Sequence, residues 1–148
     1  MSSEVLSFRD LGVSEPVVQA LVARGIVVPF PIQVMVIQDA TAGRDTLAKS
    51  KTGSGKTLGF AIPIVDQLDP RADRHPEALV LVPTRELAVQ VRDDFQDIAK
   101  AKRLNVKAVY GGTNVKEQAR GADRAHILIA TPGRLDDLVQ RKLVHLGA

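Results

Sequence analysis

The 148-residue chain contains no cysteine and no apolar run close to the length of a membrane span. Without cysteine it can form neither disulfides nor thiolate metal sites, which suits a reducing compartment. Its opening residues, MSSEVLSFRD, lack the basic and apolar regions of a signal peptide. A membrane helix needs about 20 consecutive apolar residues. We therefore expect a cytoplasmic protein that makes no membrane contact.

The chain also lacks a strong charge of either sign. Lysine and arginine number 20 against 17 acidic residues, which gives a net charge of +3. This mild basicity permits a polyanionic partner without demonstrating one. Internal repeats and low-complexity tracts are absent from the sequence, and the length is that of one ordinary domain. We expect a single globular unit with no second-domain boundary.

Short apolar runs alternate with longer amphipathic ones. Helices are predicted over residues 14–25, 31–41, 57–68, 84–102 and 132–142, and strands over 45–49, 78–83, 105–111 and 126–130. The runs at 78–83 and 126–130 are continuously apolar, as expected of strands covered on both faces. On the helix at 84–102, one buried face is predicted to carry Leu87, Val91, Phe95 and Ile98. Strand–helix alternation of this kind predicts an α/β fold with a mainly parallel sheet.

Residues 49–58 read KSKTGSGKTL and lie between a predicted strand and a predicted helix. This arrangement is typical of a phosphate-binding P-loop. Gly53 and Gly55 allow successive N–H groups to point at an anion, and the helix adds its positive end. Lys56 can reach the β- and γ-phosphates, and Thr57 offers a hydroxyl to Mg²⁺. The alternative interpretation is a surface Gly-Ser loop that happens to precede a lysine.

Five motifs together resemble one family. They are GIVVPFPIQ (25–33), SKTGSGKT (50–57), PTRELA (83–88), GG (111–112) and TPGR (131–134). Their order and spacing are similar to those of the DEAD-box RNA helicases, over essentially the whole chain. The resemblance implies a RecA-like P-loop NTPase with a three-layer fold, with ATP and Mg²⁺ as cofactors and RNA as the partner. It also implies that residues 1–148 are a partial helicase ATP-binding domain, incomplete at the C-terminus, with 1–41 as the N-terminal flank and Q-motif region.

The resemblance implies which residues hold ATP. Gln33 matches the glutamine of the Q motif, whose amide can donate and accept at the adenine edge. Phe8 takes the place of an aromatic residue that stacks on the base. The implied P-loop contacts are Ser50, Lys51, Thr52, Gly53, Ser54, Gly55, Lys56 and Thr57, with Lys56 and Thr57 catalytic and Thr57 the magnesium ligand. Taken without the other motifs, Gln33 is a polar residue on an exposed helix face and Phe8 a core side chain.

Four positions depart from the family pattern. Ser50 stands where the P-loop usually begins with glycine, Ile26 where an aromatic is usual, and Val28 where a polar residue is common. Phe30 replaces a threonine or serine. Because that hydroxyl is absent, we expect a weaker coupling of nucleotide to the loop, which changes affinity and leaves the choice of base unaffected.

In the family, three loops hold single-stranded RNA by its sugar–phosphate backbone. The matching residues here are Pro83, Thr84, Arg85, Gly111, Gly112, Thr131, Pro132, Gly133 and Arg134. Helix N-termini can present N–H groups to a phosphate, and a glycine pair allows close backbone approach. Such contacts imply binding without sequence preference and with strong salt dependence. The competing interpretation makes the arginines solvated surface residues and the threonines ordinary helix N-caps.

The sequence contains no Asp-Glu dipeptide, so the acidic motif that names the family is absent. The Ser-Ala-Thr motif and a second RecA-like domain are absent as well. Without an acid to hold Mg²⁺ and position water, phosphoryl transfer loses electrostatic stabilisation. We therefore expect the chain alone to be inactive in hydrolysis, and its incomplete sheet to expose apolar edges that favour self-association.

Three hypotheses about function remain open from the sequence. The first is an ATP-dependent RNA helicase, of which the chain supplies the nucleotide-binding part and some of the RNA-binding part. The second is a non-hydrolysing fragment that binds ATP or RNA, or only a partner. The third is a small nucleotide or metabolite kinase, against which PTRELA and TPGR argue.

Overall fold

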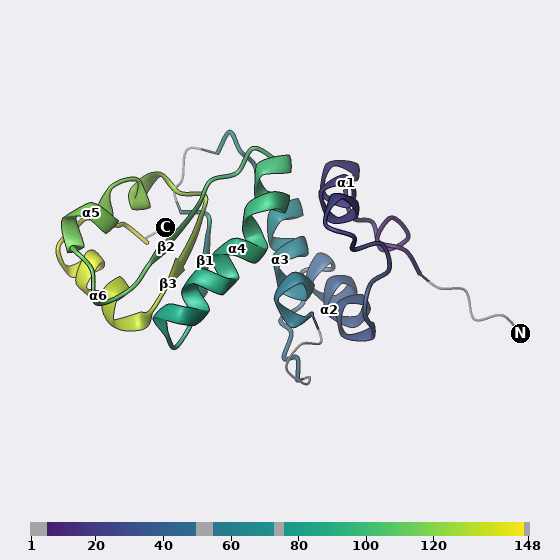
Figure 1. The fold of residues 1–148 in the computed structure, drawn as a ribbon, viewed down its shortest axis with the longest axis horizontal. Coiled ribbons are helices and arrows are strands. Elements are labelled where there is room, and N and C mark those ends of the chain that lie inside the picture. The colour runs from purple at the N-terminus through teal and green to yellow at the C-terminus, as the bar shows by residue number, and fades with distance from the viewer. Residues whose placement is uncertain (1–5, 50–54, 73–75, 147–148) are drawn as a thin grey trace, which may run out of the picture. The chain divides into compact units, whose positions relative to one another are not determined.

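The computed structural model describes residues 6–49, 55–72 and 76–146, which fall into two compact units. The first unit ends at Gln67 and the second begins at Leu68. The first is helical and the second contains the sheet (Figure 1). Each unit has its own buried apolar side chains.

Three helices make up the first unit: α1 (Glu15–Ala23), α2 (Pro31–Thr41) and α3 (Lys56–Gln67). All three predicted helices are confirmed to within two residues at each end. Helices α2 and α3 pack against each other, and Ile37 of α2 and Ile62 of α3 are buried. Asp66 of α3 accepts hydrogen bonds from the backbone N–H (2.9 Å) and the hydroxyl (2.6 Å) of Ser14, which joins the start of α1 to the end of α3.

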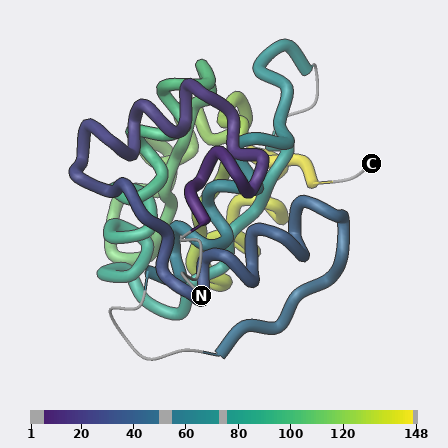
Figure 2. The backbone as a smooth tube through the Cα atoms, turned by 90° about the vertical axis from the view of Figure 1, so that its right-hand side faces the viewer, coloured from purple at the N-terminus to yellow at the C-terminus, as the bar shows by residue number. Residues whose placement is uncertain are grey.

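The prediction of a buried strand over residues 45–49 is wrong. This segment has no regular secondary structure, and all of its residues are exposed, Leu47 completely. Figure 2 shows residues 42–49 looping away from the helices of the first unit. A strand needs a neighbouring strand to bond its N–H and C=O groups. Among the residues that the structure describes, no strand pairs with this segment, so an apolar composition alone does not bury it.

The second unit is built on a parallel sheet. Its elements are β1 (Ala78–Leu81), α4 (Arg85–Ala101), β2 (Val106–Val109), α5 (Val115–Ala119), the 3₁₀ turn η1 (Ala122–Arg124), β3 (Ile127–Ala130) and α6 (Pro132–Gln140). The strand order is β1-β3-β2, and both pairings are parallel. The predicted strands and helices of this region are confirmed, with somewhat shorter strands. The turn η1 and the five-residue helix α5 were not predicted.

Strand β3 lies at the centre of this unit and is buried on both faces. Leu128 and Ala130 belong to an apolar cluster with Leu135 and Leu138 of α6. Because side chains alternate along a strand, the residues between them point to the opposite face, where α4 packs on β2 and β3. Figure 1 shows the sheet between α4 and α6. This is an α/β arrangement of three layers, consistent with an incomplete RecA-like fold.

The buried face of α4 differs by one position from the prediction. Val91, Phe95 and Ile98 are buried as expected. Leu87 is exposed, and Ala88 is buried in its place. Ala88, Val91 and Phe95 follow each other at steps of three and four residues, which is the spacing of one helix face. Leu87 lies about 100° around the helix from Ala88, since each residue turns the helix by that angle.

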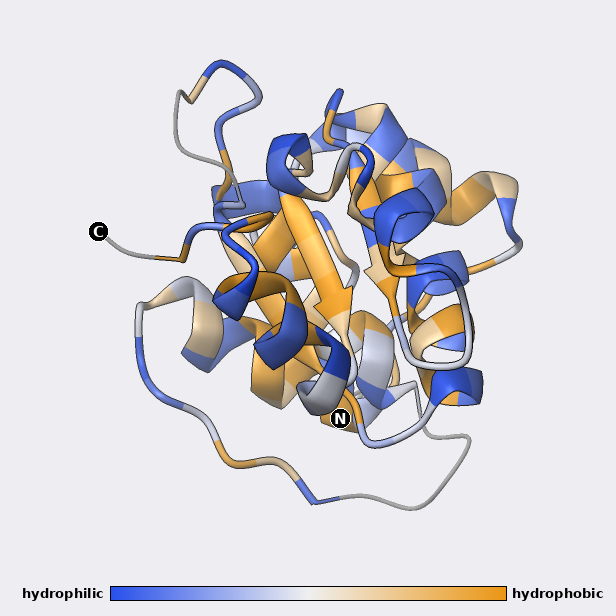
Figure 3. Ribbon diagram, turned by 90° about the vertical axis from the view of Figure 1, so that its left-hand side faces the viewer, coloured by the Kyte–Doolittle hydropathy of each residue, from blue (hydrophilic) through white to orange (hydrophobic). Residues whose placement is uncertain are grey.

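Strand β1 was expected to be covered on both faces, and this expectation is wrong. Its side chains alternate between half-buried and exposed, with Leu79 38% and Leu81 54% exposed. Within the described sheet, β1 is an edge strand that pairs only with β3, and α4 packs mainly on β2 and β3. In Figure 3 the strands are largely orange, and the helices that flank them carry blue residues as well as orange ones.

Candidate functional site

Most of the predicted P-loop lies outside the described residues. The predicted nucleotide contacts Ser50, Lys51, Thr52, Gly53 and Ser54 belong to that segment. The described part begins at Gly55, which has a left-handed φ of 82°. Lys56 and Thr57 follow in the first turn of α3 and are half-buried. The helix therefore begins where the P-loop prediction requires a helix N-terminus.

Gln33 connects α2 to the end of this loop. It is 1% exposed, so it does not lie on an exposed helix face. Its Oε1 accepts a hydrogen bond from the backbone N–H of Phe30 (2.9 Å), and its Nε2 donates to the carbonyl oxygen of Gly55 (3.1 Å). An amide has two donor and two acceptor positions. One donor and one acceptor position therefore remain for an adenine edge, and the amide must become uncovered to use them.

No space exists for a side chain at Gly55. A Cβ built there would collide with Nε2 of Gln33 and would lie 2.8 Å from Cδ2 of Phe30. The positive φ of Gly55 is also a conformation that side-chain-bearing residues rarely adopt. Steric fit and backbone conformation thus both require glycine where the loop meets α3.

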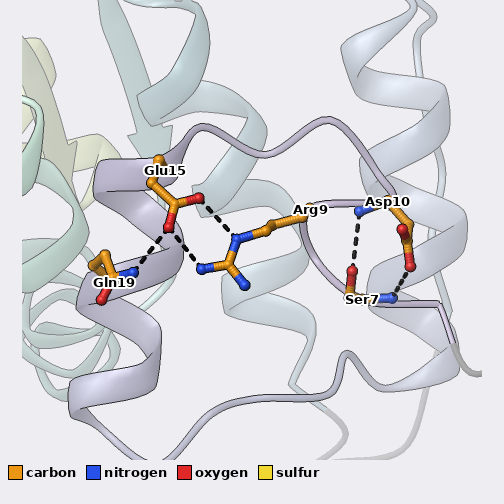
Figure 4. Close-up of polar contacts among 5 residues, drawn as sticks. All are labelled: Ser7, Arg9, Asp10, Glu15 and Gln19. Carbon is orange, nitrogen blue, oxygen red and sulfur yellow. Dashed lines mark hydrogen bonds and ion pairs between the residues drawn. The ribbon is translucent and has the colours of Figure 1, made fainter.

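The segment that carries Phe8 is held by local polar contacts (Figure 4). The backbone N–H of Ser7 donates to Asp10 Oδ2 (2.8 Å), and the backbone N–H of Asp10 donates to Ser7 Oγ (3.1 Å). The bond from the Ser7 backbone lowers the pKa of Asp10. Phe8 itself is buried, in the position of a core side chain. Its stacking on a base stays a prediction, which requires its ring to become uncovered.

Arg9 next to this turn is bonded to the first turn of α1. Its Nε and Nη2 donate to the two carboxylate oxygens of Glu15 at 2.8 and 2.6 Å. Gln19 donates to the same carboxylate (2.8 Å). Hydrogen bonding from Arg9, followed by that from Gln19, lowers the pKa of Glu15 to about 2. This contact is exposed to solvent, so it orders the segment more than it stabilises the fold.

In the second unit, the ends of the three strands coincide. Leu81 of β1 and Val109 of β2 are both in register with Ala130 of β3. Two further backbone bonds continue this alignment, from the N–H of Val82 to Ala130 O (3.0 Å) and from the N–H of Thr131 to Val109 O (3.1 Å). Since the strands are parallel, the loops that carry PTRELA, GG and TPGR leave one edge of the sheet side by side.

The loop after β1 places a threonine and an arginine at the start of α4. The Thr84 hydroxyl accepts a hydrogen bond from the backbone N–H of Leu87 (3.2 Å), so Thr84 is a helix N-cap. Arg85 is exposed, and its guanidinium carbon lies 5.2 Å from the centre of the Tyr110 ring. This distance permits a cation–π contact. Pro83 is exposed beside them.

The loop after β2 lies next to that arginine. Gly111 and Gly112 are both exposed, and Gly112 has a φ of 85°. A Cβ on Gly112 would lie 3.5 Å from Nη1 of Arg85. The absence of side chains on both glycines leaves their backbone accessible beside a guanidinium group. This combination can hold a phosphate through N–H groups and a positive charge.

The loop after β3 begins α6. Thr131 occupies the N-cap position, but its side chain makes no capping hydrogen bond, unlike that of Thr84. Pro132 and Gly133 follow in the first turn and are exposed. The start of this nine-residue helix therefore faces the same edge of the sheet as the other two loops.

Arg134 does not behave as a solvated surface residue. It is only 9% exposed. Its Nη1 donates to Gln118 Oε1 (2.8 Å) and to Thr113 Oγ1 (3.4 Å), and its Nη2 donates to Thr113 O (2.9 Å). Gln118 Oε1 also accepts the backbone N–H of Tyr110 (2.9 Å). Arg134 is thus bonded to the residues on either side of the glycine pair, directly or through Gln118.

Sequence reasoning missed Gln118 and Thr113. Helix α5, which carries Gln118, is too short and polar to show helical periodicity. One signal was present: the Asn114 side chain caps α5 by accepting from the backbone N–H groups of Lys116 (2.9 Å) and Glu117 (3.2 Å). An asparagine before a polar stretch is too common to identify a helix by itself.

Two general findings concern the described part of the chain. None of its helices is long and apolar enough to cross a membrane. No cluster of three or more histidine, cysteine, aspartate or glutamate residues suited to a metal ion occurs among residues 6–49, 55–72 and 76–146. The predicted magnesium ligand Thr57 therefore has no acidic cluster of this kind in the described structure.

Comparison with known proteins identifies relatives along most of the chain. A family model described as DEAD/DEAH box helicase matches residues 30–147. The chain is 44% identical over 141 residues to RNA helicase CrhR of Synechocystis sp., covering 95% of this chain and 28% of the relative. It is 41% identical over 140 residues to the DEAD-box ATP-dependent RNA helicase RhpA of Helicobacter pylori, covering 94% and 28%. The chain thus spans little more than a quarter of the length of these curated relatives.

A solved structure agrees with these sequence relatives. A DEAD box protein from the hyperthermophile Methanococcus jannaschii superposes with a TM-score of 0.88 at 34% identity. The match covers 97% of this chain and 39% of that protein.

Proposed function

Because the chain belongs to the DEAD/DEAH box helicase family, we propose that it supplies the nucleotide-binding and RNA-backbone-binding surfaces of an ATP-dependent RNA helicase. Its homologues carry the names of ATP-dependent DEAD-box RNA helicases. The observation that carries the proposal is the common register of Leu81, Val109 and Ala130, which brings three motif-bearing loops to one edge of the sheet. The cytoplasmic location stays a prediction.

The described end of the P-loop fits a nucleotide. Gly55 brings the backbone of the loop into contact with the Gln33 amide, an approach that a side chain at this position would block. Lys56 and Thr57 begin α3, where a helix N-terminus favours phosphate. In this proposal Gln33 selects adenine and holds the loop, Lys56 binds the β- and γ-phosphates, and Thr57 supplies a hydroxyl to Mg²⁺. When bound, Mg²⁺ neutralises negative charge that develops on the phosphates.

The RNA surface in the proposal consists of backbone N–H groups, threonine hydroxyls and one exposed guanidinium group. Thr84 and Thr131 stand at the N-termini of α4 and α6, and Arg85 lies beside the open backbone of Gly112. All of these groups suit phosphate and sugar oxygens, and none is arranged to read a base edge. We therefore expect single-stranded RNA to bind without sequence preference and with a strong salt dependence.

For the 148 residues alone, the second candidate function is binding of ATP and RNA without turnover. The observation that favours it is the absence of an Asp-Glu dipeptide from the sequence. Hydrolysis requires an acidic group that holds Mg²⁺ and orients water. Steady-state release of phosphate by the chain in the presence of RNA, at a rate well above background, would contradict this candidate.

Self-association through β1 is a further part of the proposal. The exposed Leu79 and Leu81 lie on an edge strand of the described sheet, and such an edge can pair with another chain. Sedimentation velocity over a range of concentrations measures this directly. A lone monomer at every concentration would contradict it.

The test of nucleotide binding is an equilibrium titration of the chain with Mg-ATP and with Mg-GTP. We expect ATP to bind and GTP not to bind. Lys56→Ala should abolish ATP binding, and Gln33→Ala should remove the preference for ATP over GTP. Lys49→Ala is a matched control, because Lys49 is an exposed lysine that lies before the P-loop. If neither nucleotide binds to the parent chain, the nucleotide part of the proposal is wrong for these 148 residues.

A further inference from the structure

We propose that Gln118 and Arg134 are positioning residues, which set the conformation of the Gly111–Gly112 loop and act on RNA affinity without touching RNA. The inference rests on the proposed function, because it assumes that this loop holds the RNA backbone. It assigns Arg134 a different role from Arg85, although both arginines occur in the motifs that indicate RNA binding.

The hydrogen bonds hold both ends of the glycine pair. Tyr110, directly before Gly111, donates its backbone N–H to Gln118 Oε1 at 2.9 Å. Thr113, directly after Gly112, accepts at its backbone oxygen from Arg134 Nη2 at 2.9 Å. Gln118 and Arg134 are themselves joined at 2.8 Å. One cluster therefore fixes the entry and the exit of the loop.

Burial separates the two arginines. Arg134 is 9% exposed, and both of its Nη atoms donate to oxygens of the protein. Arg85 is exposed and lies over the Tyr110 ring. A phosphate can therefore reach the guanidinium group of Arg85, whereas that of Arg134 is engaged inside the unit. Arg85 therefore supplies positive charge at the surface beside Gly112, and Arg134 holds the Gly111–Gly112 loop in its conformation.

Positioning matters here because two adjacent glycines are flexible. A glycine pair that is free to move loses conformational freedom when it binds a ligand, and that loss weakens binding. The cluster fixes the neighbouring residues before RNA arrives. Its contribution to RNA affinity is then a smaller loss of entropy on binding, which requires no contact between Gln118 or Arg134 and the ligand.

The test uses two substitutions of Gln118 in the 148-residue chain. The hydrogen bonds from Tyr110 and Arg134 both use Oε1 of Gln118 as the acceptor. Gln118→Glu keeps a carboxylate oxygen for the two donors, whereas Gln118→Met has a similar length and no comparable acceptor. Binding of a fluorescein-labelled single-stranded oligouridylate is measured by anisotropy at several salt concentrations.

We expect Gln118→Met to weaken oligouridylate binding about tenfold, as when a buried charged donor loses its partner. Gln118→Glu should bind like the parent chain. The slope of log K against log salt should be the same in all three proteins, because no phosphate contact is removed.

A second readout needs no RNA, because Tyr110 is the single tyrosine of the sequence and tryptophan is absent. The near-ultraviolet tyrosine signal should therefore change in Gln118→Met and persist in Gln118→Glu.

If Gln118→Met unfolds the second unit, as judged by far-ultraviolet circular dichroism, Arg134→Lys serves instead. Lysine keeps the positive charge, but its single ammonium group cannot reproduce the two Nη donors that the planar guanidinium of Arg134 directs at Gln118 and Thr113. We expect Arg134→Lys to lose affinity with an unchanged salt slope. Parent-like binding by Arg134→Lys, or by a folded Gln118→Met, would overturn the inference while the proposed function stands. If the parent chain binds no oligouridylate, the RNA part of the proposed function fails, and the inference fails with it.

Discussion

The two units hold their candidate binding loops by different means. In the second unit, three strands end in register at Leu81, Val109 and Ala130, so the positions of three loops follow from the sheet. In the first unit, the segment at 45–49 that leads into the predicted P-loop is exposed and unpaired. The described end of that loop is held by one side chain, because the amide of Gln33 donates to the carbonyl oxygen of Gly55. Strand pairing fixes several loops at once, whereas a single side chain fixes one point.

The largest expected effect is on the free energy of unfolding, and it compares a buried leucine of the second unit with an exposed leucine of the first. Leu138 is fully buried on α6, and Leu47 is fully exposed in the unpaired segment. Leu138→Ala should lower the free energy of unfolding by about 2–5 kcal/mol. Leu47→Ala should change it by no more than about 0.5 kcal/mol. Urea unfolding followed by circular dichroism measures both. A large loss in Leu47→Ala would show that residues 45–49 pack as the strand predicted from the sequence.

The next effect concerns Gly55, where Gln33 contacts the described end of the predicted P-loop. Gly55→Ala introduces a Cβ that collides with Gln33, at a left-handed φ. We expect ATP affinity to fall more than about tenfold, since strain of about 1–3 kcal/mol is added to the collision. Gly43→Ala is the control, because Gly43 has a φ of 78° and no atom within 4 Å of the added Cβ. Gly43→Ala should cost stability and leave ATP binding unchanged. Equal losses of affinity in both variants would contradict the role of Gln33.

A smaller effect is expected at the exposed arginine of the second unit. Arg85→Met removes a surface charge beside Gly112 and the Tyr110 ring. RNA affinity should fall by a similar factor for every sequence tested, and the salt slope should decrease in magnitude by about 1. Anisotropy titrations with oligouridylate and oligoadenylate at several salt concentrations check both statements. Arg92→Met, which removes a charge from the middle of α4, serves as the control and should keep the slope.

The smallest effect lies in the N-terminal turn of the first unit. The pKa of Glu15 is lowered from 4.5 to about 2 in the folded chain by Arg9. A lowered pKa contributes stability that is fully present above pH 4.5 and is lost as the pH falls toward 2. Because the pair is exposed, the change should be small. Thermal unfolding from pH 6 to about 2 should show a weaker pH dependence in Arg9→Met than in the parent chain. Identical pH profiles would mean that the contact adds nothing to stability.

Helices α4 and α6 and the sheet of the second unit were predictable because their patterns are local. For α4, the signal is a threonine at the N-cap position, Thr84, followed by apolar residues at helical spacing such as Val91 and Phe95. The segment at 45–49 was not predictable in the same way. Its apolar composition indicates a strand, but burial depends on a partner strand that no local pattern reveals.

The motifs indicated which loops form the candidate site, and the environment of each residue required the structure. The sequence gives no reason to assign Arg85 and Arg134 different environments, because each is an arginine within a motif. In the structure Arg85 is exposed, whereas Arg134 is buried and bonded to Thr113 and Gln118. Arg134 is buried because α6 lies next to α5, where Gln118 accepts its hydrogen bond. Helical periodicity describes one helix at a time, so it does not show which helices are neighbours. Phe8 shows the same limit, since its core position comes from the folding of the N-terminal turn.

The register of the three strand ends also sets a scale for RNA. Neighbouring strands lie about 4.8 Å apart, so loops that leave three adjacent strands are spread over about 10 Å. An edge of that width accommodates only a short footprint, on the order of one phosphate for each loop. With a slope of about −0.7 for each phosphate on single strands, a tenfold rise in salt would lower the affinity about a hundredfold. Under the proposed function, a footprint of about three phosphates makes the affinity depend on salt concentration and not on base sequence.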